Sequence, residues 1–231
     1  AGAGTQDAAL AFGGAGSGGE CACTEEYDGT SWTAGGALST ARMYLAGAGT
    51  QTSGIAFGGY NFSATACTEE YNGTAWSAGG ALITARYSLA GAGTQTSGIV
   101  FGGYEAFSTS NKTEEYNGTS WSTGGALAVA RYSLAGAGTQ NSALAFGGKL
   151  SSFCSCTEEY NGTAWSGGGN LGNGRSKLGG AGTSTSAVAF GGKNASNAYL
   201  SCTEEYSITT TYTPKKTFDY DDTTGDLDIS G

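Results

Sequence analysis

Residues 113–121 read Thr-Glu-Glu-Tyr-Asn-Gly-Thr-Ser-Trp, and close variants of this stretch return along the chain. Glu-Glu-Tyr occurs five times, and a Trp follows the Tyr by five residues in the first four copies. Phe-Gly-Gly recurs in step, with its last glycine at positions 14, 59, 103, 148 and 192, so the steps are 45, 44, 45 and 44 residues. A period near 45 residues is typical of β-propeller blades or of a solenoid.

Each unit carries four short segments with the composition of β-strands. In the third unit they are residues 85–94, 98–103, 113–118 and 120–127, which are bounded by turn-forming residues. Asn-Gly-Thr, or Asp-Gly-Thr in the first unit, separates the third segment from the fourth in units one to four. These dipeptides supply the positive φ values of a tight two-residue turn. We therefore predict a hairpin at this point of the unit, and no helix anywhere.

The order of these motifs resembles the kelch repeat. Phe101-Gly102-Gly103, Tyr116 and Trp121 take the places of that family's Gly-Gly, Tyr and Trp, and Arg86 stands where the family often has an Arg before its first strand. The high glycine content is similar to that of Gly-rich kelch-like repeats in bacteriophage tail-fibre and environmental secreted proteins. The resemblance implies an all-β, five-bladed β-propeller of four-stranded antiparallel kelch-like blades.

The expected propeller spans residues 1–216, with repeats at about 1–40, 41–84, 85–129, 130–173 and 174–216. The small residues of Ala-Gly-Ala-Gly-Thr, predicted to be the innermost strand, suit the crowded centre of a narrow ring. The first unit lacks the Ala-Arg-Tyr-Ser-Leu segment that precedes this strand in the third, and the fifth has 207–216 as a divergent fourth strand without Trp. Residues 217–231 are predicted to form a hairpin that closes the ring or leads to a neighbouring domain.

Composition excludes several function classes. The net charge is -9 and the ten Lys and Arg residues are spread along the chain, so we expect no nucleic-acid partner. No apolar run is long enough to insert into a membrane. Histidine is absent, which removes the usual general base and the commonest metal ligand. We therefore expect no catalytic residues, no cofactor and no bound metal.

The two carboxylates of each Glu-Glu pair could be taken for a catalytic acid and base. Adjacent strand residues, however, point to opposite faces of a sheet, so the two do not converge. One Glu of each pair is instead expected to meet an Arg at 42, 86, 131 or 175 across a blade junction. The aspartates of the C-terminal stretch could suggest calcium, but their spacing fails the EF-hand pattern, and a solvated hairpin is the preferred interpretation.

Six cysteines are expected to form disulfides, with pairing left open because six allow fifteen connectivities. Zinc is the less favoured alternative. The disulfide candidates are Cys21, Cys23, Cys67, Cys154, Cys156 and Cys202.

The loops between the second and third strands differ from unit to unit while the strands repeat. They span 15–22, 60–66, 104–112, 149–155 and 193–201, and all should emerge on one face. Aromatic rings beside amides and charges on loops over a rigid frame form a plausible recognition surface, although the rings could merely cap the blade edges. The candidate binding residues are Tyr60, Asn61, Phe62, Tyr104, Glu105, Phe107, Lys149, Phe153, Lys193, Asn194 and Tyr199.

These observations favour a non-enzymatic binding and structural module, extracellular or virion-borne, in a phage tail fibre or similar appendage. Its expected partner is a cell-surface glycan or protein. The alternative is a ligand-free building block of a filament or virion decoration that contacts other subunits. An enzyme is the remote third reading.

Overall fold

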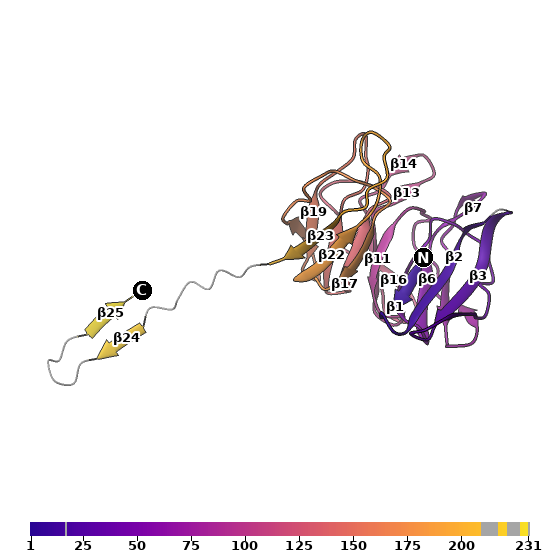
Figure 1. Cartoon of the computed structure of the whole chain (residues 1–231), viewed down its shortest axis with the longest axis horizontal. Coiled ribbons are helices and arrows are strands. Elements are labelled where there is room, and N and C mark those ends of the chain that lie inside the picture. The colour runs from indigo at the N-terminus through magenta and orange to yellow at the C-terminus, as the bar shows by residue number, and fades with distance from the viewer. Residues whose placement is uncertain (17, 209–216, 221–226, 231) are drawn as a thin grey trace.

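The computed structural model describes residues 1–16, 18–208, 217–220 and 227–230. These residues form β-strands and no helix, and hence no helix that could span a membrane. Five antiparallel sheets follow one another along the chain and are arranged as a five-bladed β-propeller (Figure 1). The predicted fold class is confirmed.

Four of the blades have four strands in sequence order from the inside outwards. Blade 1 contains β1 (Gly2–Gly4), β2 (Ala9–Gly16), β3 (Gly19–Tyr27) and β4 (Trp32–Ala34). Blade 2 contains β5 (Ala46–Thr50), β6 (Ser53–Phe57), β9 (Thr68–Tyr71) and β10 (Trp76–Ala78). Blade 3 contains β11 (Ala90–Gly93), β12 (Gly98–Phe101), β15 (Thr113–Tyr116) and β16 (Trp121–Thr123). Blade 4 contains β17 (Ala135–Thr139), β18 (Ser142–Phe146), β19 (Thr157–Tyr160) and β20 (Trp165–Gly167).

Blade 5 has three described strands, β21 (Gly179–Gly182), β22 (Ser186–Phe190) and β23 (Thr203–Ser207). The fourth strand expected within 207–216 falls mainly on residues 209–216, which lie outside the described part. In the C-terminal stretch, β24 (Thr217–Tyr220) pairs antiparallel with β25 (Leu227–Ser230). Their connection, residues 221–226, also lies outside the described residues.

The innermost strands hold consecutive blades together. β1 contacts β5, β5 contacts β11, β11 contacts β17, and β17 contacts β21. The alternating glycines of these strands have a steric reason, because a Cβ at Gly47 or Gly91 would overlap the ring of Phe12 or Phe57 from the preceding blade. Each blade therefore inserts a phenylalanine over a glycine of the next one.

Each of the four hydrophobic clusters lies between two consecutive blades. At the junction of blades 2 and 3, Trp121 is 7% exposed and packs edge-on against Phe57, with ring centroids 5.5 Å apart. Its Nε1 donates to Thr68 Oγ1 at 3.0 Å. The Tyr116 hydroxyl donates to Glu70 Oε1 at 2.6 Å. The same Trp–Thr bond joins Trp76 to Thr24 and Trp165 to Thr113. The same Tyr–Glu bond joins Tyr71 to Glu26, Tyr160 to Glu115 and Tyr206 to Glu159.

The predicted Asn-Gly hairpins form, but the two-residue turn was wrong. Tyr71 pairs directly with Trp76, so four residues make the turn. Asn72 Oδ1 accepts from the main-chain N–H groups of Thr74 and Ala75, and Gly73 alone takes a positive φ, of 89°. An Asn or Asp is therefore needed here as a side-chain acceptor.

The Glu-Glu pairs divide between the two sheet faces as predicted, but the Arg–Glu ion pair lies within one blade and does not cross a junction. Arg86 Nη2 lies 2.8 Å from Glu114 Oε1, and both side chains are buried. The Arg86 main-chain carbonyl accepts instead from Gly59 N of the preceding blade. Burial lowers the pKa of the Arg86 guanidinium, although Glu114 opposes that effect. The equivalent pairs are Arg42 with Glu69, Arg131 with Glu158 and Arg175 with Glu204.

Candidate functional site

The connections between second and third strands take different forms in different blades. In blade 1 there is no separate loop, because β2 and β3 continue pairing to Gly16 and Gly19. The other connections pair with the segment that precedes strand one of their own blade, as in the bridges Met43 with Tyr60 and Tyr87 with Tyr104. Blade 1 has no such bridge among its described residues.

Two of these loops contain small ladders of their own. β7 (Tyr60–Asn61) pairs with β8 (Ser63–Ala64), and β13 (Tyr104–Glu105) pairs with β14 (Ser108–Thr109). In blades 4 and 5 single bridges take their place, Lys149 with Phe153 and Lys193 with Tyr199.

A row of tyrosines runs over this face from blade to blade. Tyr87 lies between Tyr60 and Tyr104, with ring centroids 5.2 and 5.5 Å away, and Tyr104 lies 5.5 Å from Tyr132. Tyr44 adds a fifth ring, 6.3 Å from Tyr87. Burial and the neighbouring tyrosines raise the pKa of Tyr87, so its hydroxyl stays protonated well above neutral pH. The predicted residues Tyr60 and Tyr104 thus belong to one continuous aromatic surface.

Sequence reasoning missed the other half of this row. Tyr44, Tyr87 and Tyr132 come from the segments that precede strand one, and not from the variable loops. The repeated Arg-Tyr-Ser-Leu at 86–89 and 131–134 was the available signal. It was read as part of the inner strand, whereas the strand begins only at Ala90 and Ala135.

A hollow beside this row is bounded by four residues in an unusual backbone conformation. Tyr44, Ser88, Ser133 and Lys177 have φ between 52° and 56°, and Leu45, Leu89, Leu134 and Leu178 lie next to them in the lining. A chain of main-chain bonds stabilises this rim: Ser88 N donates to Tyr44 O, Ser133 N to Ser88 O, and Lys177 N to Ser133 O. The left-handed conformation is costly for residues other than glycine.

A second hollow shares Ser133 and Lys177 with the first and carries positive charge. Of the described residues that line it, three are lysines, Lys149, Lys177 and Lys193, and none is acidic. Tyr132 and Phe153 add aromatic rings to the same lining. Lys149 Nζ lies 5.0 Å from the Phe153 ring centroid, and Lys193 Nζ lies 4.2 Å from that of Tyr199. Lysines so placed attract anionic groups, in contrast to the negative charge of the chain as a whole.

The remaining predicted residues do not converge. Phe62, Phe107 and Tyr199 are 86%, 93% and 82% exposed at loop tips. Asn61 pairs with Ser63 in the turn of its own ladder, and Asn194 Oδ1 accepts from Ser196 N and Ala198 N. Asn194 also lines a hollow with Phe153.

Glu105 is held by a local ion pair, 2.8 Å from Lys112 Nζ. Partial burial would raise the pKa of its carboxyl, but bonds from Lys112 and Ser110 outweigh that and lower it. Its negative charge is therefore matched within the loop of blade 3.

The Cys-x-Cys sequences form two disulfides, Cys21 with Cys23 and Cys154 with Cys156, with Cα atoms 5.4 and 5.3 Å apart. Cys67 and Cys202, also predicted to pair, are free thiols among the described residues. Cys67 Sγ accepts from Arg42 Nη1 at 3.4 Å, and Cys202 Sγ from Arg175 Nη1 at 3.3 Å. Within the described ranges no three His, Cys, Asp or Glu side chains gather as metal ligands.

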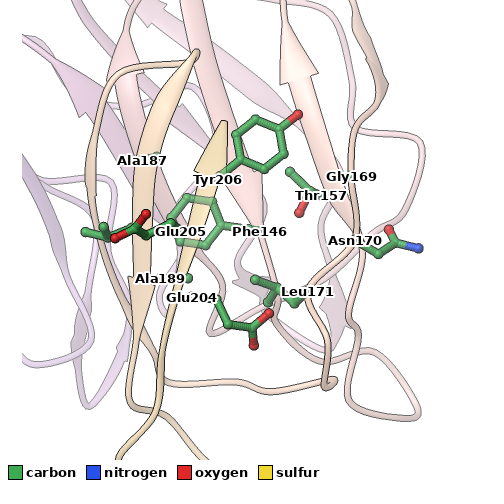
Figure 2. Close-up of a pocket in the computed structure, with 11 residues that line it drawn as sticks. Phe146, Thr157, Gly169, Asn170, Leu171, Ala187, Ala189, Glu204, Glu205 and Tyr206 are labelled. Carbon is green, nitrogen blue, oxygen red and sulfur yellow. The ribbon is translucent and has the colours of Figure 1, made fainter. Parts of the chain in front are cut away.

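A further cavity lies away from the loop face, at the junction of blades 4 and 5 (Figure 2). Phe146, Thr157, Leu171, Ala189 and Tyr206 line it. The corresponding positions at the junction of blades 3 and 4 surround Trp165. The cavity is thus the place that a tryptophan fills elsewhere, and the fifth unit has no tryptophan.

No protein-family model matches the chain, and no curated protein matches its sequence. The motifs and the loop-face geometry therefore carry the functional argument.

Proposed function

We propose that this protein is a non-enzymatic binding module that recognises a cell-surface glycan through its loop face, and that its blades are of the kelch type. The observation that carries the proposal is the continuity of the five-tyrosine row with the lysine-lined hollow. Aromatic rings offer flat apolar surfaces with a polar edge, which suit the apolar faces of sugar rings.

The three lysines sharpen the ligand class. Lys149, Lys177 and Lys193 surround a hollow without an acidic residue in its described lining, while the protein carries a net charge of -9. A glycan that bears carboxylates would place them against these ammonium groups and its sugar rings against the tyrosines. We therefore assign acidic cell-surface polysaccharides as the preferred ligand class, and an extracellular or virion-borne location such as a tail fibre follows from that role.

The test is calorimetric titration with a polyuronic acid and with a neutral polysaccharide, together with binding to intact bacteria. We expect saturable binding of the acidic polymer that weakens with salt, and little binding of the neutral one. Tyr104→Ala and Lys193→Gln should each weaken binding. The matched control is Lys193→Arg, which keeps the positive charge at the hollow and should retain the affinity that Lys193→Gln loses. If neither polymer nor the intact bacteria show detectable binding, the proposal is overturned.

A ligand-free building block remains the second candidate function because a separate observation favours it. Trp32 and Phe190, on the first and last blades, are 49% and 45% exposed, although their counterparts at the inner junctions are largely buried. Exposed aromatic residues on end blades are expected of a protein that contacts other subunits.

A further inference from the structure

The first three blade junctions use one set of contacts, of which the fourth keeps the Tyr–Glu bond and the Phe ring over a glycine, and that set defines two different faces. One face presents a Gln, a Tyr and a Trp as donors, and the other presents a Phe ring, a Thr hydroxyl and the second Glu of the pair. At the junction of blades 1 and 2, Trp76 packs on Phe12 with centroids 4.9 Å apart and donates to Thr24 Oγ1. Gln51 Nε2 donates to the carbonyls of Ala9 and Tyr27.

Blade 1 carries the whole donor set on its outward side, where none of the other described blades covers it. We name Gln6, Tyr27 and Trp32 the leading face. Gln6 and Trp32 are exposed, and Tyr27 is only partly buried. At the junction of blades 2 and 3 the Trp of this position is buried, and at the other two junctions that have one it is partly buried.

Blade 5 carries the matching acceptor set on its outward side. We name Phe190, Thr203 and Glu205 the trailing face. All three are exposed, whereas their counterparts at the junction of blades 2 and 3, Phe57 and Thr68, are buried. The leading and trailing faces therefore have the same complementarity as the inner junctions.

The two faces do not meet within one chain. The innermost strands of consecutive blades touch, but β21 and β1 make no contact of that extent. In Figure 1 the strands β2 and β3 lie on the opposite side of the blades from β22 and β23. Among the described residues, the trailing face is thus not covered by blade 1 and can receive the leading face of another molecule.

We propose that this protein associates head to tail with a second copy of itself, the leading face of one chain docking on the trailing face of the next. The inner junctions specify the contacts: Trp32 stacks on Phe190 and donates to Thr203, and Tyr27 donates to Glu205. Such an interface is heterologous, so it can continue beyond a dimer into short filaments. This inference is independent of the loop-face ligand.

The experiment measures mass by sedimentation velocity and light scattering over a wide concentration range. We expect the wild-type mass to rise with concentration past that of a dimer. Trp32→Ala and Phe190→Ala should each weaken association by at least about tenfold, since buried aromatic anchors dominate interface energetics. Phe107→Ala removes a more exposed ring from a loop tip and should have no effect on association.

Mixing the two variants gives the decisive result. Phe190→Ala keeps an intact leading face, and Trp32→Ala keeps an intact trailing face, so the mixture should form dimers that neither variant forms alone. A wild-type chain that stays monomeric at every concentration overturns the proposal. That result is expected if the leading and trailing faces of one chain contact each other. Failure of the mixture to restore dimers overturns it as well. Loss of polysaccharide binding alone would leave it intact.

Discussion

The junction of blades 2 and 3 and the junction of blades 4 and 5 share two recurring contacts and differ in two others. The second junction lacks the tryptophan, and Ser184 stands there in place of Gln95. In both, a Tyr of the later blade donates to the second Glu of the earlier one, and a Phe of the earlier blade lies over a glycine of the later one. Trp121 fills the first junction, while a cavity occupies the second (Figure 2).

Thr157 Oγ1 is buried in the emptier junction and has no hydrogen-bond partner among the described residues, whereas Thr68 Oγ1 accepts from Trp121. Blade 5 nevertheless takes its place in the propeller. Blade 5 is therefore positioned without the tryptophan, and the tryptophan adds stability to a junction that other contacts already specify.

The largest expected effect on stability comes from removing the tryptophan at the junction of blades 2 and 3. Trp121→Ala should lower the free energy of unfolding by about 3–5 kcal/mol, because it leaves a cavity and an unpaired Thr68 hydroxyl. Urea unfolding followed by far-UV circular dichroism measures it. Trp32→Ala changes the same repeat position where the ring is half exposed, and in dilute monomeric protein it should stay within about 0.5 kcal/mol of wild type. Equal losses at the two positions would contradict the contrast between them.

Filling the cavity between blades 4 and 5 should raise the free energy of unfolding. Thr211 occupies the tryptophan position of the fifth unit in sequence, five residues after Tyr206. Thr211→Trp is expected to stabilise the protein by about 0.5–2 kcal/mol, the usual gain from filling a cavity. Part of that gain should vanish in a Thr157→Val background, because the indole N–H then has no acceptor. If Thr211→Trp does not raise the free energy of unfolding, the cavity does not receive the ring.

The Tyr–Glu bond, present in both junctions, should contribute less. Tyr116→Phe removes the hydroxyl that donates to Glu70 and should cost about 1 kcal/mol. Tyr27→Phe serves as the control, since Tyr27 lies on the uncovered side of blade 1, and dilute protein should tolerate it. Chemical denaturation of the two variants side by side measures the difference.

The smallest effect appears only at high pH. Burial first, and then the bond to Glu115, raises the pKa of Tyr160 to about 12 from its ordinary value of 10. The folded state therefore retains a proton that the unfolded state releases, and this contribution to stability is complete below pH 10 and disappears as the pH rises towards 12. Tyr160→Phe should flatten the fall in stability over that window, measured by urea titrations at several pH values. An unchanged slope would mean that other groups set the alkaline limit.

The sequence was sufficient for the repeating parts of this molecule. The Phe-Gly-Gly and Glu-Glu-Tyr spacing predicted the blades, and strand alternation correctly separated Glu114 from Glu115. The turn at Asn72 was assigned wrongly because a positive φ for Gly73 fits both a two-residue turn and the observed four-residue one. The Arg–Glu pairs were placed across junctions because nothing in a repeat pattern says to which copy a contact belongs.

The candidate site was less predictable than the blades. Variable loops marked Tyr60, Tyr104, Lys149 and Lys193 correctly as neighbours on one face, but half of the tyrosine row lies in segments that repeat and so attracted no notice. The uncovered sides of blades 1 and 5 could not be foreseen either. Closure depends on the small rotation between consecutive blades, which no single residue encodes.

The rim of the hollow lined by Leu45, Leu89, Leu134 and Leu178 has a consequence for the proposed binding role. Tyr44, Ser88, Ser133 and Lys177 are joined by main-chain bonds alone, so their side chains take no part in holding the rim together. Three different residue types, Tyr, Ser and Lys, already occupy geometrically equivalent positions there. New side chains at these four places would change the lining of the hollow without breaking these main-chain bonds, which makes the rim the place where the proposed binding could be redirected.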